Sequence, residues 1–176
     1  ILFMKLIEHF VGGKIIPGTS DKKGKVFNPA TGDQEKEVRI ASKKDLDSAV
    51  EVAKKAFQEW SVKPSLVRAR VMFKFKELIE KNSDELTQLI VNEHGKVYED
   101  AKGSLTRGLE VVEFACGIPH LLKGEFSENV GTNVDSWSIR QPLGVVAGIT
   151  PFNFPAMVPM WMFPIAIACG NTFILK

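Results

Sequence analysis

Apolar residues in the middle of the chain recur every three or four positions, which is the spacing of amphipathic helices packed on a core. Ser42 and Asp45 match a capping box and predict that the first of these helices starts there. Its predicted core positions are Leu46, Ala49, Val50, Ala53, Ala56, Phe57 and Trp60. Pro64–Ser65 predicts the start of a second helix, and a third is predicted between a cap at Asn82–Ser83 and a stop near Gly95.

A long helix is predicted from Val97 to about Leu122. It contains Gly103 and Gly108, which are poor helix formers, so we expect a neighbouring backbone or a ligand to come close there. Arg107 lies between them. The residues alone favour an exposed Arg107 paired with Glu110 on the next turn. The alternative is a guanidinium that holds a substrate carboxylate.

Strands are predicted on both sides of the helical region. The Gly12–Gly13 pair between apolar segments predicts a hairpin, and residues 28–33 predict a second turn. We interpret these N-terminal strands as a structural edge. Further on, Trp137 and Ile139 alternate with polar residues, which is the pattern of a half-buried strand.

The last part of the chain predicts a strand, a turn, a helix and a second strand. Gly144–Thr150 is short, apolar and partly β-branched, as in a strand buried on both faces. A helix is predicted over Ala156–Cys169, then a stop at Gly170–Asn171 and a strand over Thr172–Lys176. Sites in α/β sheets collect beyond the carboxyl ends of strands. That rule places Asn153, a lone polar side chain in an apolar turn, at a ligand site.

The charge of the chain gives no reason to expect nucleic acid or an acidic membrane surface as a partner, because the net charge is only +2. The second predicted helix does carry basic residues on the side that we expect to be exposed. These are Arg68, Arg70, Lys74, Lys76 and Lys81. Glu77 and Glu80 interrupt this face and no aromatic residues interleave with it, so we interpret it as a solvated surface.

The run from Gln141 to Leu175 has no charged residue and is long enough for a membrane span. Several prolines fall inside it, namely Pro151, Pro155, Pro159 and Pro164, so two buried strands around one buried helix explain it better. Cys116 and Cys169 have no metal-ligand spacing. We therefore predict no metal site, and reduced thiols in a cytoplasmic protein. The N-terminal residues, with Met4 as a candidate start, do not match a signal peptide.

Two segments carry a resemblance to a known family. Pro151-Phe-Asn-Phe-Pro155 follows a predicted buried strand, and Phe173-Ile-Leu-Lys176 ends the next one. Together they resemble the NAD-dependent aldehyde dehydrogenase superfamily, and the resemblance extends over essentially the whole chain. Phe152, Arg107–Gly108 and the Val-Glu-Phe-Ala sequence at 112–115 are similar to the methylmalonate-semialdehyde dehydrogenase subfamily, which is acylating and uses coenzyme A.

The resemblance implies an α/β fold, the N-terminal part of an aldehyde dehydrogenase. It would contain helices, the first strand–helix–strand of a Rossmann-like parallel sheet and a protruding β-ribbon. Residues 1–124 would belong to the NAD-binding domain, and residues 144–176 would begin its Rossmann-like sheet without completing it. Residues 125–143 would form an oligomerisation ribbon that pairs with another subunit of a homo-oligomer, a dimer or tetramer.

The resemblance also implies roles for particular residues. The side-chain amide of Asn153 would help to form an oxyanion hole, and Arg107 would bind the carboxylate of the substrate aldehyde. The residues implied for NAD binding are Ile149, Thr150, Pro151, Phe152 and Lys176, with Lys176 on the adenosine ribose. The resemblance also implies that the catalytic cysteine lies beyond Lys176. Cys116 and Cys169, in apolar surroundings without an adjacent base or cation, are interpreted as core thiols.

The complete enzyme is then expected to oxidise methylmalonate or malonate semialdehyde with NAD and coenzyme A. The products would be an acyl-CoA, CO2 and NADH, formed through a cysteine thioester. Residues 1–176 alone are expected to be an inactive fragment. Two alternatives stay open: a non-catalytic remnant that binds only nucleotide or a partner subunit, and another NAD-dependent aldehyde dehydrogenase subfamily.

Overall fold

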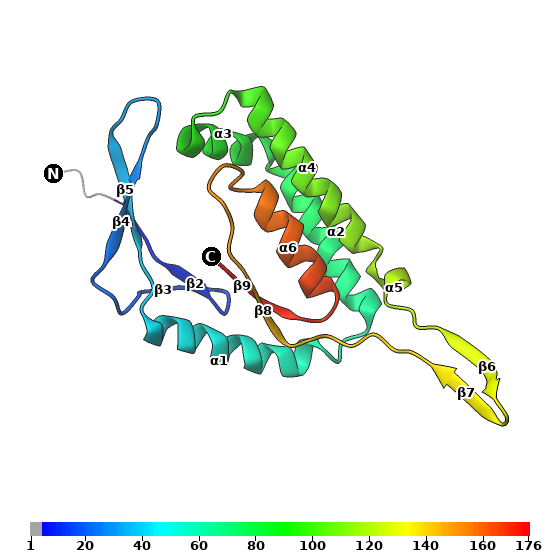
Figure 1. Cartoon of the computed structure of the whole chain (residues 1–176). Coiled ribbons are helices and arrows are strands. Elements are labelled where there is room, and N and C mark those ends of the chain that lie inside the picture. The colour runs from blue at the N-terminus through cyan, green and yellow to red at the C-terminus, as the bar shows by residue number, and fades with distance from the viewer. Residues whose placement is uncertain (1–4) are drawn as a thin grey trace.

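The fold combines a helical layer with several small sheets, as the computed structural model of residues 5–176 shows (Figure 1). Ile1–Met4, and with them the candidate start at Met4, lie outside the described residues. The helices are α1 (Lys43–Trp60), α2 (Ser65–Lys81), α3 (Ser83–His94), α4 (Tyr98–Cys116), α5 (Ile118–Leu121) and α6 (Met157–Ala168). The strands are β1 (Lys5–Ile7), β2 (His9–Val11), β3 (Lys14–Ile16), β4 (Lys23–Phe27), β5 (Gln34–Arg39), β6 (Phe126–Gly131), β7 (Val134–Trp137), β8 (Val145–Gly148) and β9 (Thr172–Leu175).

The capping box predicted at the start of α1 is confirmed. The Ser42 hydroxyl accepts a hydrogen bond from the Asp45 N–H at 3.1 Å, and the Asp45 carboxylate accepts one from the Ser42 N–H at 2.8 Å. The same carboxylate accepts the Thr19 N–H at 2.9 Å, which ties the preceding loop to the helix. These bonds, led by the one from the Ser42 backbone, hold the pKa of Asp45 below its ordinary value.

α3 begins and ends where predicted, but its predicted side-chain cap is absent, and the predicted end of α4 is wrong. α3 has no side-chain cap, because the Asn82 amide instead donates to the Leu78 carbonyl at 2.6 Å. α4 ends at Cys116 and does not continue to about Leu122. A single turn, α5, follows with Pro119 near its start, where the missing N–H of proline costs no helical hydrogen bond.

The helices bury a core in two clusters. The first joins α2, α4, α5 and α6 through Ala69, Met72, Ala115, Cys116, Ile118 and Ala168. The second joins α2, α3, α4 and α6 through Ile79, Ile90, Ala101, Leu105, Val112 and Met160. α2, α4 and α6 contribute to both, so they form the centre of the helical layer.

Gly108 confirms the expectation of a close approach within α4. A Cβ atom at Gly108 would lie 2.4 Å from Met160 Cε and 3.2 Å from Met157 Cα, so α4 and α6 are in backbone contact there. At Gly103 no described backbone comes close, since a Cβ atom there would meet no described atom within 4 Å, and the expectation of a ligand at Gly103 stays a prediction.

Arg68 corrects the prediction of an exposed basic face on α2. Its side chain is only 6% exposed, and it donates from Nε to the Ala168 carbonyl at 2.9 Å and from Nη1 to the Lys63 carbonyl. Arg68 therefore binds the last turn of α6 to the start of α2. Burial lowers the pKa of this guanidinium from its ordinary value.

The strand–helix–strand unit predicted at the end of the chain is confirmed. β8 and β9 pair in parallel, with Val145 opposite Thr172 and Gly148 opposite Leu175. α6 connects them and packs on one face, and α1 contacts the other face (Figure 1). The uncharged run therefore forms two short strands and the helix between them, with the turn after β8 left exposed. Within residues 5–176, no helix is long and apolar enough to cross a membrane.

The N-terminal region forms the two turns predicted for it. β2 and β3 make a hairpin whose loop, Gly12–Gly13, has positive φ angles of 60° and 79°, as a type I′ turn requires. β4 and β5 pair antiparallel across the second predicted turn. β1 was not predicted: it adds to β5 in parallel, from a distant part of the sequence.

β6 and β7 form a two-stranded ribbon that projects from the helical layer (Figure 1). The ribbon was expected from the resemblance, but the predicted half-buried strand pattern is wrong. Every residue of both strands is exposed, and Trp137 is 66% exposed. Ile139 lies beyond the end of β7.

Candidate functional site

The carboxyl ends of β8 and β9 meet at one edge of the sheet. Beyond β8, the backbone N–H of Thr150 donates to the Lys176 carbonyl at 2.8 Å. The Thr150 hydroxyl reaches the same carbonyl at 3.2 Å, and the Lys176 N–H donates to the Gly148 carbonyl at 2.9 Å. Two segments that are 26 positions apart in the sequence, the turn after β8 and the end of β9, therefore lie side by side.

The turn that follows Thr150 is open to solvent. Pro151, Phe152 and Asn153 are exposed, and Phe152 retains 89% of its surface. Within residues 5–176 the Asn153 side chain makes no hydrogen bond, so it does not cap a backbone group of its own turn. Its amide N–H groups are free to donate to a ligand at this edge.

Phe154 attaches the exposed turn to the body of the protein. Its ring is partly buried and lies 3.9 Å from the Lys96 ammonium, measured to the ring centroid. Lys96 belongs to the connection between α3 and α4. Sequence reasoning missed this contact, because nothing in the local pattern links positions 96 and 154.

Gly148 brings α6 close to the sheet just before the turn. A Cβ atom at this position would lie 2.6 Å from Met162 Sδ and 2.7 Å from Phe173 Cζ. The end of β8 is therefore fixed by close packing immediately before the exposed residues begin. A rigid strand end next to an open turn is a common basis for a ligand site.

Arg107 lies on α4 beside α6. Its side chain is exposed, and its backbone carbonyl accepts a hydrogen bond from Trp161 Nε1 of α6 at 3.4 Å. The predicted pair with Glu110 is absent: among the described residues, the Arg107 guanidinium forms no ion pair. The exposed Arg107 guanidinium is therefore available for an anionic group.

The two cysteines are free thiols, as predicted. Burial raises the pKa of both, although the Arg68 guanidinium opposes this effect at Cys169. A raised pKa keeps a thiol protonated, so neither cysteine is an activated nucleophile. No cluster of metal-binding side chains occurs within residues 5–176.

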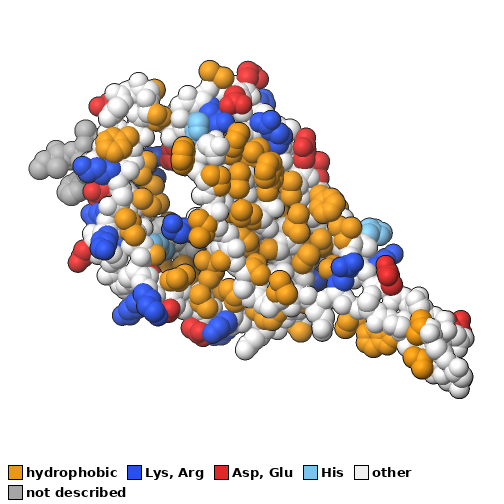
Figure 2. Space-filling view, viewed as in Figure 1, with side chains coloured by type: hydrophobic (Ala, Val, Ile, Leu, Met, Phe, Trp, Pro, Cys, Tyr) orange, Lys and Arg blue, Asp and Glu red, His pale blue; other side chains and the backbone are white. Residues whose placement is uncertain are grey.

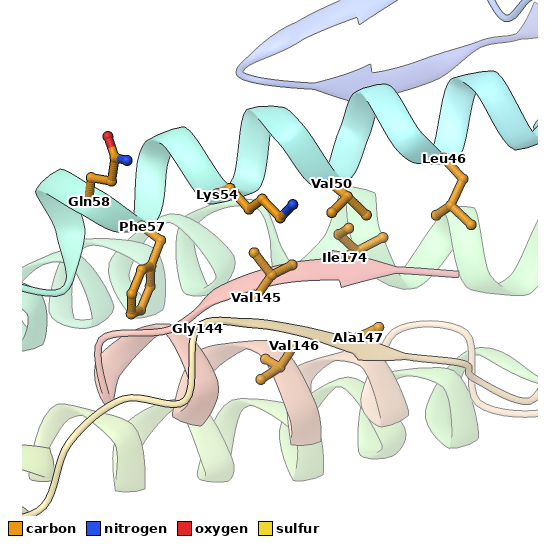
Figure 3. Close-up of a pocket in the computed structure, with 10 residues that line it drawn as sticks. All are labelled: Leu46, Val50, Lys54, Phe57, Gln58, Gly144, Val145, Val146, Ala147 and Ile174. Carbon is orange, nitrogen blue, oxygen red and sulfur yellow. The ribbon is translucent and has the colours of Figure 1, made fainter.

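A pocket of about 710 Å³ lies elsewhere, between α1 and the face of the β8–β9 sheet (Figure 3). Its lining is mostly apolar, and Figure 3 shows Val50 of α1 facing Val145 and Ile174 across it. None of the residues predicted for the site lines this pocket. The carboxyl edge, where Asn153 and the residues predicted for NAD binding lie, is the better candidate site, and Arg107 lies apart from it on α4.

The exposed turn at the carboxyl edge of a parallel strand pair, with its Asn153 amide, agrees with the family expected from the sequence. The profile of the aldehyde dehydrogenase family matches residues 15–176. The chain belongs to the aldehyde dehydrogenase family. Since that match covers most of the chain, the described helices, sheets and ribbon are parts of an aldehyde dehydrogenase fold.

Several similar proteins of about 50% identity are named malonate- or methylmalonate-semialdehyde dehydrogenases. A malonate-semialdehyde dehydrogenase of Pseudomonas aeruginosa is 52% identical over 98% of this chain and 35% of its own length. A mitochondrial, acylating methylmalonate-semialdehyde dehydrogenase of Arabidopsis thaliana is 49% identical over 97% of this chain and 28% of its own. A Sinorhizobium meliloti protein, provisionally described as a methylmalonate-semialdehyde dehydrogenase and solved with NAD, has a TM-score of 0.96 and 53% identity. That match covers 100% of this chain and 36% of the other.

The chain therefore spans about a third of the length of these relatives. What the relatives' names say of substrate, acylation and cofactor applies to the relatives. The described structure contains one candidate part of an aldehyde dehydrogenase site, the exposed turn with its neighbouring strand end. It contains no activated thiol within residues 5–176.

The residues predicted for NAD fit that ligand class in their chemistry. Ile149 and Phe152 are 74% and 89% exposed, and such apolar surface suits the flat rings of a dinucleotide. Lys176 is exposed at the same edge and, among the described residues, forms no ion pair. Apolar surface next to a free ammonium group can bind a ligand that carries both rings and hydroxyl or phosphate groups.

Proposed function

We propose that this chain forms the oxyanion-binding turn and part of the cofactor cleft of an NAD-dependent semialdehyde dehydrogenase. Its substrates would be methylmalonate semialdehyde and malonate semialdehyde. The observation that carries the proposal is the free Asn153 amide in an exposed turn beside the end of β9. Family membership and the names of the relatives support the class of substrate.

Asn153 would act on the aldehyde oxygen. When a thiolate adds to the aldehyde carbon, negative charge develops on that oxygen, and a prepositioned N–H group stabilises it. The thiolate would come from a cysteine other than Cys116 and Cys169, because burial keeps those two protonated. Asn153 would therefore contribute an oxyanion donor to a site completed by other residues.

Ile149, Thr150, Pro151, Phe152 and Lys176 would hold the cofactor at the carboxyl edge of the sheet. NAD, when bound, supplies the hydride acceptor that aldehyde oxidation requires. Lys176 would donate hydrogen bonds to the ribose hydroxyls of the adenosine. Coenzyme A would act as the second substrate and accept the acyl group, and this part of the proposal is supported by the acylating Arabidopsis relative.

Arg107 would recognise the carboxylate that distinguishes a semialdehyde of this kind from a simple aldehyde. Its guanidinium is exposed and free of ion pairs within the described residues, and the Arg107 backbone lies beside α6, which starts just after the turn. A planar guanidinium can hold a carboxylate through two hydrogen bonds.

The test uses the full-length protein with NAD, coenzyme A and malonate semialdehyde, and follows NADH formation. We expect Asn153→Ala to lower kcat by about a hundredfold or more, the usual effect of losing one oxyanion donor. The Kd for NAD should hardly change in this variant. Asn92→Ala, at an exposed position on α3, is the matched control and should keep full activity.

Substrate recognition is tested separately. Arg107→Ala should raise KM for the carboxylated aldehyde by at least tenfold and leave KM for propanal unchanged, since only the former has a carboxylate to lose. Arg70→Ala, an exposed arginine on α2, serves as the control. Unchanged KM for the carboxylated aldehyde in Arg107→Ala would refute the assignment of the substrate. Absence of any turnover by the unmodified protein would favour the role of a non-catalytic binding module.

A further inference from the structure

The turn that carries Asn153 has few attachments of its own. Within the described residues, no hydrogen bond involves Pro151, Phe152 or Asn153, and all three are exposed. Phe154 is the first partly buried side chain after them. The position of the Asn153 amide therefore depends on how firmly the neighbouring Phe154 ring is held.

Lys96 contacts that ring in an unusual setting for a lysine. Its ammonium lies 3.9 Å from the centroid of Phe154, and its side chain is only 10% exposed. A cation over an aromatic face is attracted to the ring's negative face, and the attraction grows when water is excluded. Asp100, in the first turn of α4, binds the same ammonium at 3.1 Å and helps to hold it in place.

The backbone around Lys96 is also fixed. α3 ends at Gly95, which has a φ of 81° and donates its N–H to the Val91 carbonyl at 2.8 Å. This left-handed residue reverses the chain direction, and α4 starts only a few residues later. A Cβ atom at Gly95 would lie 3.0 Å from Pro29 Cγ, so the connection also packs against the turn between β4 and β5.

We propose that Lys96 is a positioning residue for the oxyanion donor. Its ammonium holds the Phe154 ring, and the ring holds the backbone of the turn, so that the Asn153 amide is already oriented before substrate arrives. In this role Lys96 acts through the Phe154 ring and not on the substrate itself. The inference rests on the proposed function, because it concerns the same oxyanion donor.

The physical basis is preorganisation. A hydrogen-bond donor stabilises developing charge most when it does not have to reorganise during the reaction. An exposed turn without internal hydrogen bonds would otherwise sample several orientations of Asn153. A loss of orientation should appear in kcat and leave the affinity for NAD nearly unchanged.

The experiment compares Lys96→Met, Lys96→Arg and Phe154→Leu in the full-length protein. Methionine keeps the length of the side chain without its charge, and arginine keeps a cation that can stack on the ring. We expect Lys96→Met to lower kcat about tenfold with little change in the Kd for NAD, and Lys96→Arg to recover most of it. Lys102→Met is the matched control, because Lys102 contacts Tyr98 and Asp84 and should affect neither quantity.

A double variant distinguishes two ways in which Lys96 could act. It could hold the Phe154 ring in place, or its charge could act directly on the oxyanion. If Lys96 acts through Phe154, adding Lys96→Met to Phe154→Leu should cost no further activity. Hydrogen exchange gives a readout independent of turnover: the Val158 amide, which donates to the Phe154 carbonyl at 3.3 Å, should exchange several-fold faster in Lys96→Met.

The possible outcomes are distinct. An active unmodified protein in which Lys96→Met changes neither kcat nor exchange at the Val158 amide would overturn the inference, and so would fully additive losses in the double variant. No aldehyde oxidation by the unmodified protein would instead reject the proposed function itself. In that case, faster exchange in Lys96→Met would still establish the hold on the turn.

Discussion

The α6 region and the β6–β7 ribbon both carry large apolar side chains, but those on the core side of α6 are buried and those of the ribbon are exposed. Met157 and Met160 of α6 are 5% exposed, whereas Phe126 and Trp137 of the ribbon are 65% and 66% exposed. Figure 2 shows hydrophobic side chains gathered around α6 and others standing along the projecting ribbon. Similar side chains therefore have different environments, and the difference lies in which segments of the chain reach them.

α6 is covered by elements from distant parts of the sequence. α2 and α4 pack on it, and β8 and β9 lie beneath it. In the ribbon, both faces remain open within the described structure, and a lone two-stranded hairpin is marginally stable in water. We therefore propose that a second copy of the chain covers the ribbon. This proposal is the oligomerisation role that the family resemblance implied for residues 125–143.

The largest effect is expected at the buried end of α6. Arg68→Met should destabilise the protein by about 3 kcal/mol, because the Ala168 and Lys63 carbonyls lose their charged donor in a buried place. Denaturant unfolding measures the loss. Arg70→Met, at an exposed position two residues further along the same helix, should change stability by less than about 0.5 kcal/mol. Equal effects of the two variants would contradict this account of α6.

Two glycines of α4, one in a packed position and one in an open position, test the same contrast between covered and uncovered segments. Gly108→Ala should cost about 2 kcal/mol, because the new methyl group would meet Met160 and the Met157 backbone. Gly103→Ala faces open space and should stabilise the helix by about 0.5–1 kcal/mol. Thermal unfolding of both variants tests the difference in sign. Destabilisation by Gly103→Ala would indicate a contact at that position outside residues 5–176.

The half-buried N-terminal region should show a smaller effect that depends on pH. Glu8 accepts hydrogen bonds from Arg39 at 2.8 Å and from the Gly18 N–H at 3.0 Å. These bonds, the one from Arg39 first, lower the pKa of Glu8 from 4.5 to about 2. A carboxylate with a lowered pKa stabilises the fold above its unfolded-state pKa, and this contribution is lost as the pH falls from about 4.5 towards 2.

Glu8→Gln should therefore lower Tm at neutral pH, and the difference from the unmodified protein should shrink as the pH drops below about 4.5. Glu59→Gln, at an exposed position on α1, is the control and should show no such trend. A difference that stays constant between neutral pH and pH 2 would rule out the linkage to Glu8.

The smallest effect on stability is expected in the ribbon. Trp137→Ser should change the unfolding free energy of the protein by less than about 0.5 kcal/mol, since Trp137 is exposed. If a second copy covers the ribbon, the same variant should reduce the oligomeric mass measured by light scattering. Ser136→Ala on the same strand should leave the mass unchanged. An unaltered mass in Trp137→Ser would argue against the ribbon as an interface.

The sequence by itself determined much of the local structure and the family. The capping box at Ser42, the Gly12–Gly13 hairpin and the strand–helix–strand after Gly144 were predicted because each depends on neighbouring residues. The Pro-Phe-Asn-Phe-Pro turn indicated the aldehyde dehydrogenase family, which the family profile confirms. The roles of Asn153, Arg107 and Lys176 remain predictions, although the structure places Asn153 and Lys176 on one edge of the sheet.

Tertiary structure alone decided which side chains are buried and which distant residues meet. Arg68 has the pattern of an exposed helical residue, yet it is buried because the end of α6 brings two carbonyl groups to it. Trp137 has the pattern of a half-buried residue, yet no described segment covers it. The contact between Lys96 and Phe154 spans two elements far apart in the sequence. Such contacts depend on how the elements pack, and local periodicity contains no information about that packing.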